Sequence, residues 1–285
     1  MTVSAPGKLM LFGEHAAVYG YPCIVTAISE RLDVAITGAD DLPGDRRFVD
    51  AAIKAWGAGR NIKLSVTCRF SGCYGFGSSS AVTVATLKAL KPDADNRAVF
   101  DAAYNIVRDI QGAASGFDMA AAVYGGTLYY IKDKTIEPLA VTDMPLVVGY
   151  TGVKADTKVL IADVFAKRTK EPEKVERIFA AIGKIVEEAK NKIIESDWER
   201  AGRLMDFNQD YLRDLGVSSG KLEELIEAAK GAGAYGAKLS GAGGGDCMIA
   251  LTPPDKRQAI ETAITHAGGE IVHVTPNAEG VRIEP

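Results

Sequence analysis

The stretch from residue 4 to residue 20 reads SAPGKLMLFGEHAAVYG and places three chemically active side chains around an apolar, strand-like run. Lys8 comes before that run, and Glu14 and His15 follow it. Taken alone, such a lysine is usually a solvated surface residue, and such a histidine is usually a partly buried structural one. The spacing alone therefore does not establish a site. Two glycine-rich segments farther along the chain add further evidence.

The first of these segments reads GFGSSS, residues 75–80, and precedes a predicted helix at residues 79–90. Glycines allow close backbone approach and positive φ angles, and the free N–H groups of a helix start favour a phosphate. The serine hydroxyls add donors, and one of them can ligate magnesium. A tight turn with an ordinary serine cap explains the segment equally well. Neither a Walker P-loop nor the GxGxxG fingerprint is present in it.

The other segment reads SGAGGGD, residues 240–246, and lies between two strand-like runs, 234–239 and 247–251. Its four glycines exceed what a hairpin needs, which favours a backbone pressed against a ligand or against packed strands. A flexible linker is the alternative, and the apolar flanking runs argue against it.

Together and in this order, the three segments resemble the signature motifs of the GHMP kinases. The first is most similar to the version in mevalonate kinases, because residues 6–8 and 13–20 follow Pro-Gly-Lys and Gly-Glu-His-Ala-Val-Val-Tyr/His-Gly with one difference, at Ala17. Ser115-Gly-Phe-Asp118 resembles the motif of the catalytic aspartate, and residues 150–157 resemble the strand and turn whose threonine reaches the acceptor pocket. The resemblance runs from residue 3 to about residue 252.

This resemblance implies an α+β, two-domain GHMP kinase fold with the site between the domains. Residues 1–150 would form an ATP-binding domain like the second domain of ribosomal S5, and residues 151–285 a ferredoxin-like C-terminal domain. The implied reaction is ATP-dependent phosphorylation of the mevalonate hydroxyl to phosphomevalonate, a step in isoprenoid precursor synthesis, with ATP and Mg2+ as cofactors.

The resemblance also implies roles for individual residues. Lys8 and Asp118 would be catalytic, with Lys8 beside the acceptor hydroxyl and Asp118 accepting or orienting its proton. The residues expected to bind ATP are Gly75, Gly77, Ser78, Ser79 and Ser80, with Ser79 also on the metal. The residues expected to contact the acceptor are Glu14, His15, Thr157, Gly241 and Ala242.

One position departs from the family pattern. A glutamate eleven residues before the catalytic aspartate usually helps to hold magnesium, and here that position is Val107. Our hypothesis is that ATP phosphates, the Ser79 hydroxyl and water hold the metal, so that Val107→Glu lowers the magnesium requirement. The alternative is that Val107 packs in the helix core and another acidic residue, such as Asp109, takes over; two residues apart on a helix, Asp109 points to a different face.

Composition narrows the classes of partner. The chain has 285 residues, 47% of them hydrophobic, and 33 basic against 37 acidic residues give a net charge of -4. This balance gives no electrostatic footprint for nucleic acid or an anionic membrane. No signal segment and no apolar run of about 20 residues is visible, so a cytoplasmic protein with a small-molecule substrate is expected. A homodimer is compatible with the resemblance, but the sequence does not fix the oligomeric state.

The expected elements alternate strands and helices, with a change of composition near residue 150. Strands are predicted at 23–28, 31–37, 62–70, 127–131 and 146–150, and helices at 79–90 and 96–111. Residues 154–231 are predicted to form several helices, including an amphipathic one over 174–194. The tail is predicted as an α+β unit with strands at 234–239, 247–251, 270–275 and 280–283.

Three alternatives to the implied activity stay open. Phosphomevalonate kinase is favoured by the lead-in Cys73-Tyr74-Gly75 and by Gly245-Asp246-Cys247. A galactokinase is disfavoured because residues 16–19 lack Thr-Asp-Tyr after Gly-Glu-His. A catalytically weak binding or regulatory protein is suggested by Val107, although retention of Lys8 and Asp118 speaks against it.

Overall fold

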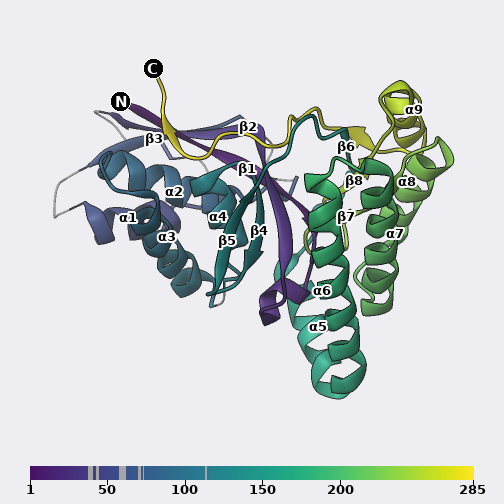
Figure 1. The fold of residues 1–285 in the computed structure, drawn as a ribbon. Helices are drawn as coiled ribbons and strands as arrows, with labels where there is room; N and C mark the ends of the chain where they lie inside the picture. Colours follow the sequence, from purple (N-terminus) through teal and green to yellow (C-terminus); the bar gives the residue numbers. More distant parts are fainter. Residues whose placement is uncertain (38–40, 43–44, 58–61, 70–71, 73, 113) are drawn as a thin grey trace.

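Two antiparallel sheets, each covered by helices, make up the protein in a computed structural model (Figure 1). The structure describes residues 1–37, 41–42, 45–57, 62–69, 72, 74–112 and 114–285. In Figure 1 the larger sheet, with helices α1–α4, lies on the left, and the smaller sheet, with α6–α9, lies on the right. The expected α+β two-domain fold is therefore confirmed.

The larger sheet runs in the order β10-β1-β2-β4-β5, with β3 also paired to β2. Its strands are β1 (Thr2–Phe12), β2 (Cys23–Thr37), β3 (Lys63–Cys68), β4 (Thr127–Ile131), β5 (Thr135–Leu139) and β10 (Arg282–Ile283). Its helices are α1 (Arg47–Trp56), α2 (Ser78–Leu90), α3 (Asn96–Gln111) and α4 (Phe117–Tyr124). Helices α2 and α4 pack directly on β1 and β2, so their N-termini reach the strand that carries Lys8.

The smaller sheet runs in the order β7-β8-β6-β9. Its strands are β6 (Leu146–Tyr150), β7 (Gly236–Ser240), β8 (Cys247–Leu251) and β9 (Glu270–Ile271). The helices of this half are α5 (Thr157–Lys170), α6 (Pro172–Ile194), α7 (Trp198–Leu215), α8 (Gly220–Gly231) and α9 (Arg257–His266). Two short 3-10 turns, η1 (Ala16–Tyr19) and η2 (Pro254–Lys256), complete the described elements. Among the described residues, no helix is long and apolar enough to cross a membrane.

Most predicted elements begin and end close to the expected residues. Helix α3 and strands β4, β6 and β8 occupy the predicted ranges. The two runs 23–28 and 31–37 form a single strand, because β1 pairs along both parts while β4 pairs with the first part and β3 with the second. The predicted strand 62–70 is shorter, Lys63–Cys68, and its expected last residue, Phe70, lies outside the described residues.

The chain changes sheets between β5 and β6 and returns at the end. Strand β6 already belongs to the smaller sheet, whereas β10 pairs with β1 of the larger one. The buried guanidinium of Arg31 on β2 holds the returning segment, because it donates hydrogen bonds to the carbonyls of Glu279 and Gly280, each at 2.7 Å. The two sheets therefore do not separate at one point of the sequence, and a division into domains at residues 1–150 and 151–285 remains a proposal.

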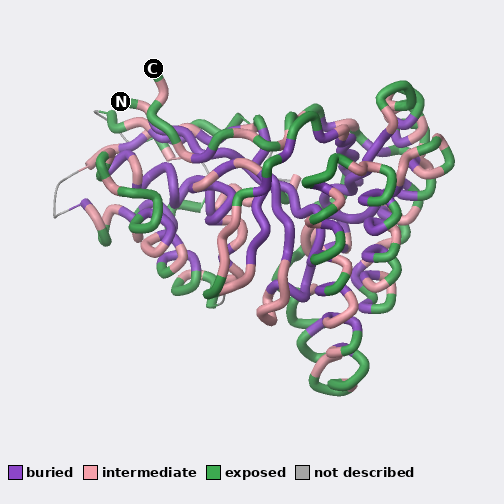
Figure 2. The backbone as a smooth tube through the Cα atoms, viewed as in Figure 1, coloured by how far each residue is buried: buried purple, intermediate pink, exposed green. Residues whose placement is uncertain are grey.

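The two halves share a buried junction. Buried residues form a continuous band along the centre of β1 and β2 and on into the smaller sheet (Figure 2). The Ser240 hydroxyl on β7 accepts a hydrogen bond from Met10 N and donates one to Met10 O, both at 3.0 Å. Helix α6 contacts β1 and β2 as well as α7, and so spans both halves. This junction brings motifs more than 200 residues apart into one region.

Candidate active site

Lys8 and Asp118, the two expected catalytic residues, lie together at the junction. Lys8 follows a register shift in β1 between Pro6 and Lys8, and its backbone N–H donates to Phe76 O at 3.0 Å. Its Nζ lies 3.3 Å from Asp118 Oδ1 and donates to Gly75 O at 3.2 Å. Asp118 stands in the first turn of α4, where the helix dipole favours a carboxylate. A cation, a carboxylate and the glycine-rich loop of residues 75–80, called the phosphate loop below, therefore meet at one point.

The start of α2 opens toward the same point. Gly77 is the helix N-cap with φ 79°, and a Cβ placed there would lie 3.3 Å from Lys8 Cε and 3.8 Å from Asp118 Cγ. The N–H groups of Ser78 and Ser79 have no acceptor among the described residues. Free amides at a helix N-terminus beside a lysine make an anion-binding site.

The hydroxyls of Ser79 and Ser80 have different surroundings. Ser79 is half-buried, and its Oγ is 3.5 Å from Nε2 of Gln111 on α3. Ser80 is 2% exposed, and its hydroxyl donates to Met119 Sδ at 3.0 Å inside the core. The geometry thus leaves Ser79 available to a phosphate or metal and gives no support to an ATP contact from the Ser80 hydroxyl.

Glu14, in the turn that follows β1, forms a buried ion pair with Lys238 on β7. Both side chains are 0% exposed, and Lys238 Nζ donates to Glu14 Oε1. Burial raises the pKa of Glu14 and lowers that of Lys238, while each charge opposes the shift of the other. Glu14 Oε2 has no hydrogen-bond partner among the described residues. Glu14, expected to contact the acceptor, thus faces Lys238 in the interior.

His15 is positioned by the same turn. It has φ 60° and is 6% exposed, and its Nε2 lies 2.8 Å from Ala242 O in the glycine segment. Because a carbonyl oxygen only accepts, Nε2 carries the proton, and burial lowers the pKa of the ring and favours its neutral form. Two of the expected acceptor contacts, His15 and Ala242, are therefore neighbours.

The glycine segment 240–246 is packed against protein rather than uniformly open. A Cβ on Gly243 would overlap with the carbonyl oxygen of Val217, and one on Gly245 with that of Val153. A Cβ on Gly241 would meet nothing within 4 Å. The excess of glycine is thus explained by close backbone packing, while Gly241 faces open space. Thr157, the remaining expected acceptor contact, is exposed at the start of α5.

Comparisons with known proteins show the family of this chain. The models of the GHMP kinases N terminal domain and the GHMP kinases C terminal region match residues 46–126 and 185–270. A mevalonate kinase of Thermococcus gammatolerans is 38% identical, with 99% of this chain and 97% of that protein aligned. The chain belongs to the GHMP kinases. The resemblance seen in the sequence motifs is confirmed.

Solved structures show the same fold in other GHMP kinases. The structure of the L. major mevalonate kinase in complex with R-mevalonate has a TM-score of 0.83 and 27% identity, covering 97% of this chain and 95% of that one. A Streptococcus pneumoniae phosphomevalonate kinase also has a TM-score of 0.83, with 18% identity and coverage of 97% and 99%. At that identity the second likeness shows a shared fold alone.

The acidic residues that the structure of this GHMP kinase describes do not form a metal cage. Among the described residues, no group of three or more His, Cys, Asp or Glu side chains could hold a metal ion. Val107 is 3% exposed and packs in the core, and Asp109 is exposed and pairs with Arg108 at 3.2 Å. These surroundings favour the core-packing alternative for Val107. Magnesium needs only one or two protein ligands besides phosphates, so the residues fit a metal that the nucleotide carries.

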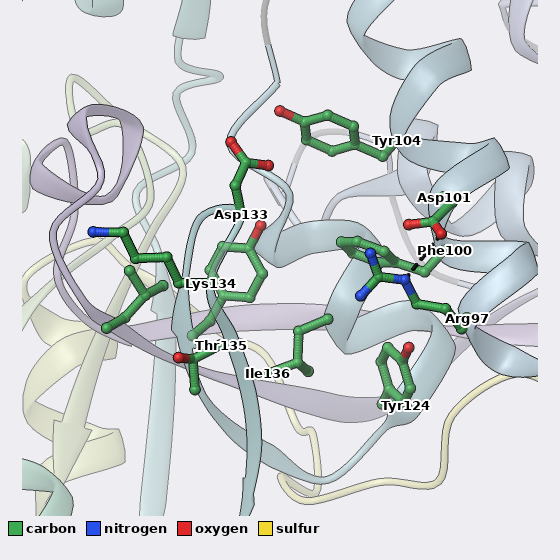
Figure 3. A pocket seen from close by; sticks show the side chains of 11 residues that line it. Arg97, Phe100, Asp101, Tyr104, Tyr124, Asp133, Lys134, Thr135 and Ile136 are labelled. Atoms are coloured by element: carbon green, nitrogen blue, oxygen red, sulfur yellow. Dashed lines mark hydrogen bonds and ion pairs between the residues drawn. The ribbon is translucent and has the colours of Figure 1, made fainter.

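A separate cavity of about 390 Å³ lies on the α3 side of the β4–β5 hairpin (Figure 3). Tyr104, Tyr124, Arg97 and the hairpin turn at Asp133 are among its lining residues. None of the expected site residues lines it. Its link to the catalytic region is Tyr130, whose hydroxyl donates to Ser115 O at 3.0 Å, just before α4.

Residues to which the motifs assigned no role complete the region. Lys238 lies in an apolar strand between Ala237 and Leu239, and a lone lysine in such a run was a signal for a buried partner. Asp246 packs against Gly75 of the phosphate loop, and burial raises its pKa against the opposing effects of the hydrogen bond from Ala155 N and the charges of Lys154 and Lys8. Lys154 Nζ donates to Gly72 O, so the turn before α5 also reaches the segment that leads into the loop.

Proposed function

We propose that the protein transfers the γ-phosphoryl group of ATP to the hydroxyl of mevalonate. The observation that carries the proposal is the meeting of Lys8 and Asp118 at the free N-terminus of α2. Phosphoryl transfer depends mainly on positioning and on neutralising charge, and these groups supply both.

In this reaction the α2 amides and the hydroxyls of Ser78 and Ser79 bind the ATP phosphates. Lys8 lies between Gly75 O and Asp118, so its ammonium holds the loop and stabilises the negative charge that develops on the acceptor oxygen. Asp118 orients the acceptor hydroxyl and takes its proton. Mg2+, when bound with ATP, offsets the charge of the phosphates, and the Ser79 hydroxyl is a protein oxygen near them.

Support for mevalonate as the acceptor comes from the named relatives. The Thermococcus gammatolerans protein aligns over nearly the full length of both chains. The protein of L. major was solved with R-mevalonate. His15 lies against Ala242, and the neighbouring Gly241 faces open space. We assign the acceptor to these residues, together with the exposed Thr157.

The test is an ADP-release assay with mevalonate, phosphomevalonate, homoserine and galactose in parallel. We expect turnover with mevalonate well above that with the other three acceptors. Faster turnover with phosphomevalonate would contradict mevalonate as the acceptor but would still support kinase activity. No turnover with any of the four, in protein that still binds ADP, would reject the proposed reaction.

A further inference from the structure

Asp246 is a carboxylate at the phosphate loop that the reaction described above leaves without a role. It is 8% exposed and has φ 54°. Its Oδ1 accepts a hydrogen bond from Ala155 N at 2.9 Å, whereas its Oδ2 accepts none from the described residues. Oδ2 is directed at Gly75, since a Cβ on Gly75 would lie 3.0 Å from Asp246 Cγ and closer still to Oδ2. Asp246 thus places one carboxylate oxygen that accepts no hydrogen bond from the described residues directly against the loop at Gly75.

The cations nearby are engaged elsewhere. Lys8 Nζ lies 3.3 Å from Asp118 and 3.2 Å from Gly75 O, and Lys154 Nζ donates to Gly72 O. Neither lysine forms an ion pair with Asp246 in the described structure. Lys8 and Lys154 act on the Asp246 carboxylate only from a distance, as opposing effects on its pKa. Its negative charge therefore adds repulsion at the loop that would receive the nucleotide phosphates, and a cation between the two would offset that repulsion.

We propose that Asp246 binds, through Oδ2, the divalent cation that accompanies the nucleotide phosphates, an inference that rests on the ATP-dependent function proposed above. Magnesium prefers oxygen ligands and is generally held by one or two carboxylates, phosphate oxygens and water. Asp246 supplies such a carboxylate from the C-terminal glycine segment. Helix α3 does not, because Val107 is buried in the core and Asp109 is exposed and paired with Arg108.

Asp246→Asn separates this role from a structural one. The amide keeps the size of the side chain and an oxygen that can accept from Ala155 N, and it removes the charge. We expect two opposite effects on calorimetric titrations with ADP. In EDTA the variant binds ADP more tightly than the wild type, because repulsion is lost; with excess Mg2+ it binds more weakly. The ratio of the two dissociation constants changes by about tenfold or more, the scale of losing one group at a metal site.

The matched control is Asp109→Asn, which removes the same charge from an exposed residue of α3. We expect wild-type dissociation constants for it in both buffers. A second readout is the electron paramagnetic resonance of Mn2+ titrated with protein and ADP, in which Asp246→Asn leaves more Mn2+ free than Asp109→Asn does.

The outcomes are distinct. Equal dissociation constants for the wild type and Asp246→Asn in both buffers, or a loss of affinity in both, would overturn the role of Asp246 while magnesium-dependent ADP binding still supports a kinase. A magnesium effect confined to Asp109→Asn would overturn it as well. Wild-type protein that binds no ADP in either buffer would overturn the proposed function and this inference together.

Discussion

Lys238→Met should be among the most destabilising single substitutions in this protein, because it leaves Glu14 charged and unpaired in the interior. Both side chains are 0% exposed, so no solvent replaces the lost partner. Glu14 Oε2 already lacks a hydrogen bond among the described residues, so the remaining contacts cannot compensate. Removing one partner of a buried pair costs about 3–5 kcal/mol. For a chain of this size we expect a fall in melting temperature of roughly 6–15 °C.

The pH dependence of this loss has a definite sign. Burial raises the pKa of folded Glu14 above its ordinary value of 4.5, so the folded state binds the proton more tightly than the unfolded state. The stability that this group contributes is therefore present at low pH and is lost as pH rises through the folded pKa. Without Lys238 its opposing charge and hydrogen bond are gone, only a backbone hydrogen bond and the smaller effect of the Lys8 charge still oppose burial, and the pKa of Glu14 rises further. Lys238→Met should thus be less destabilised near pH 5 than near pH 8.

Denaturant unfolding at both pH values, followed by circular dichroism, measures these differences. The double variant Glu14→Gln/Lys238→Met removes both charges and should recover most of the lost stability, to within about 2 kcal/mol of the wild type. A loss below about 1 kcal/mol for Lys238→Met, or a loss that is the same at both pH values, would refute the reasoning.

Three further predictions concern single positions. Asp118→Asn should lower kcat by at least about 100-fold while calorimetric ADP binding stays the same, because the side chain acts on the acceptor; near-normal turnover would contradict this. Val107→Glu should lower stability by about 3 kcal/mol, since its carboxylate enters the core, without changing the magnesium concentration for half-maximal rate; a stable variant that needs less magnesium would restore the metal hypothesis. Gly243→Ala should cost about 2 kcal/mol or more, because it adds an overlap with Val217 O to the strain of φ 86°, whereas Gly241→Ala, at φ 101° in open space, carries the strain alone; equal melting temperatures for the two would contradict it.

Elements with local signals were predictable from the sequence. Helix α3 begins and ends where expected. Asp95 caps its start by accepting a hydrogen bond from Ala98 N, and Gly112 ends it in a left-handed conformation. Strand β5 was not predicted, because Glu137 and Pro138 interrupt the pattern of a strand. Pro138 is tolerated there because β5 is an edge strand that, among the described strands, pairs only with β4. Helix α4, with only 8 residues, is too short to show an apolar period.

The candidate site also has features that the sequence predicted and features that it did not. The motifs predicted that Lys8, Asp118 and the start of α2 lie together, and the structure places them side by side. The partner of Glu14 is 224 residues away in Lys238, and no local pattern connects them. The packing of Val107 also depends on which face of α3 meets the core. Such pairings follow from how the two sheets meet, which the linear sequence does not display.

The pairing of β10 with β1 has a consequence for synthesis on the ribosome. Chains emerge from the N-terminus, and domains generally fold in that order. Here the larger sheet lacks its edge strand until residues 282–283 emerge, after the whole smaller sheet has been made. Until then the unpaired edge of β1 is a template for strands of other chains, and the carbonyls that bind Arg31 are absent. The nascent protein should therefore depend most on chaperones in the interval before residues 282–283 emerge.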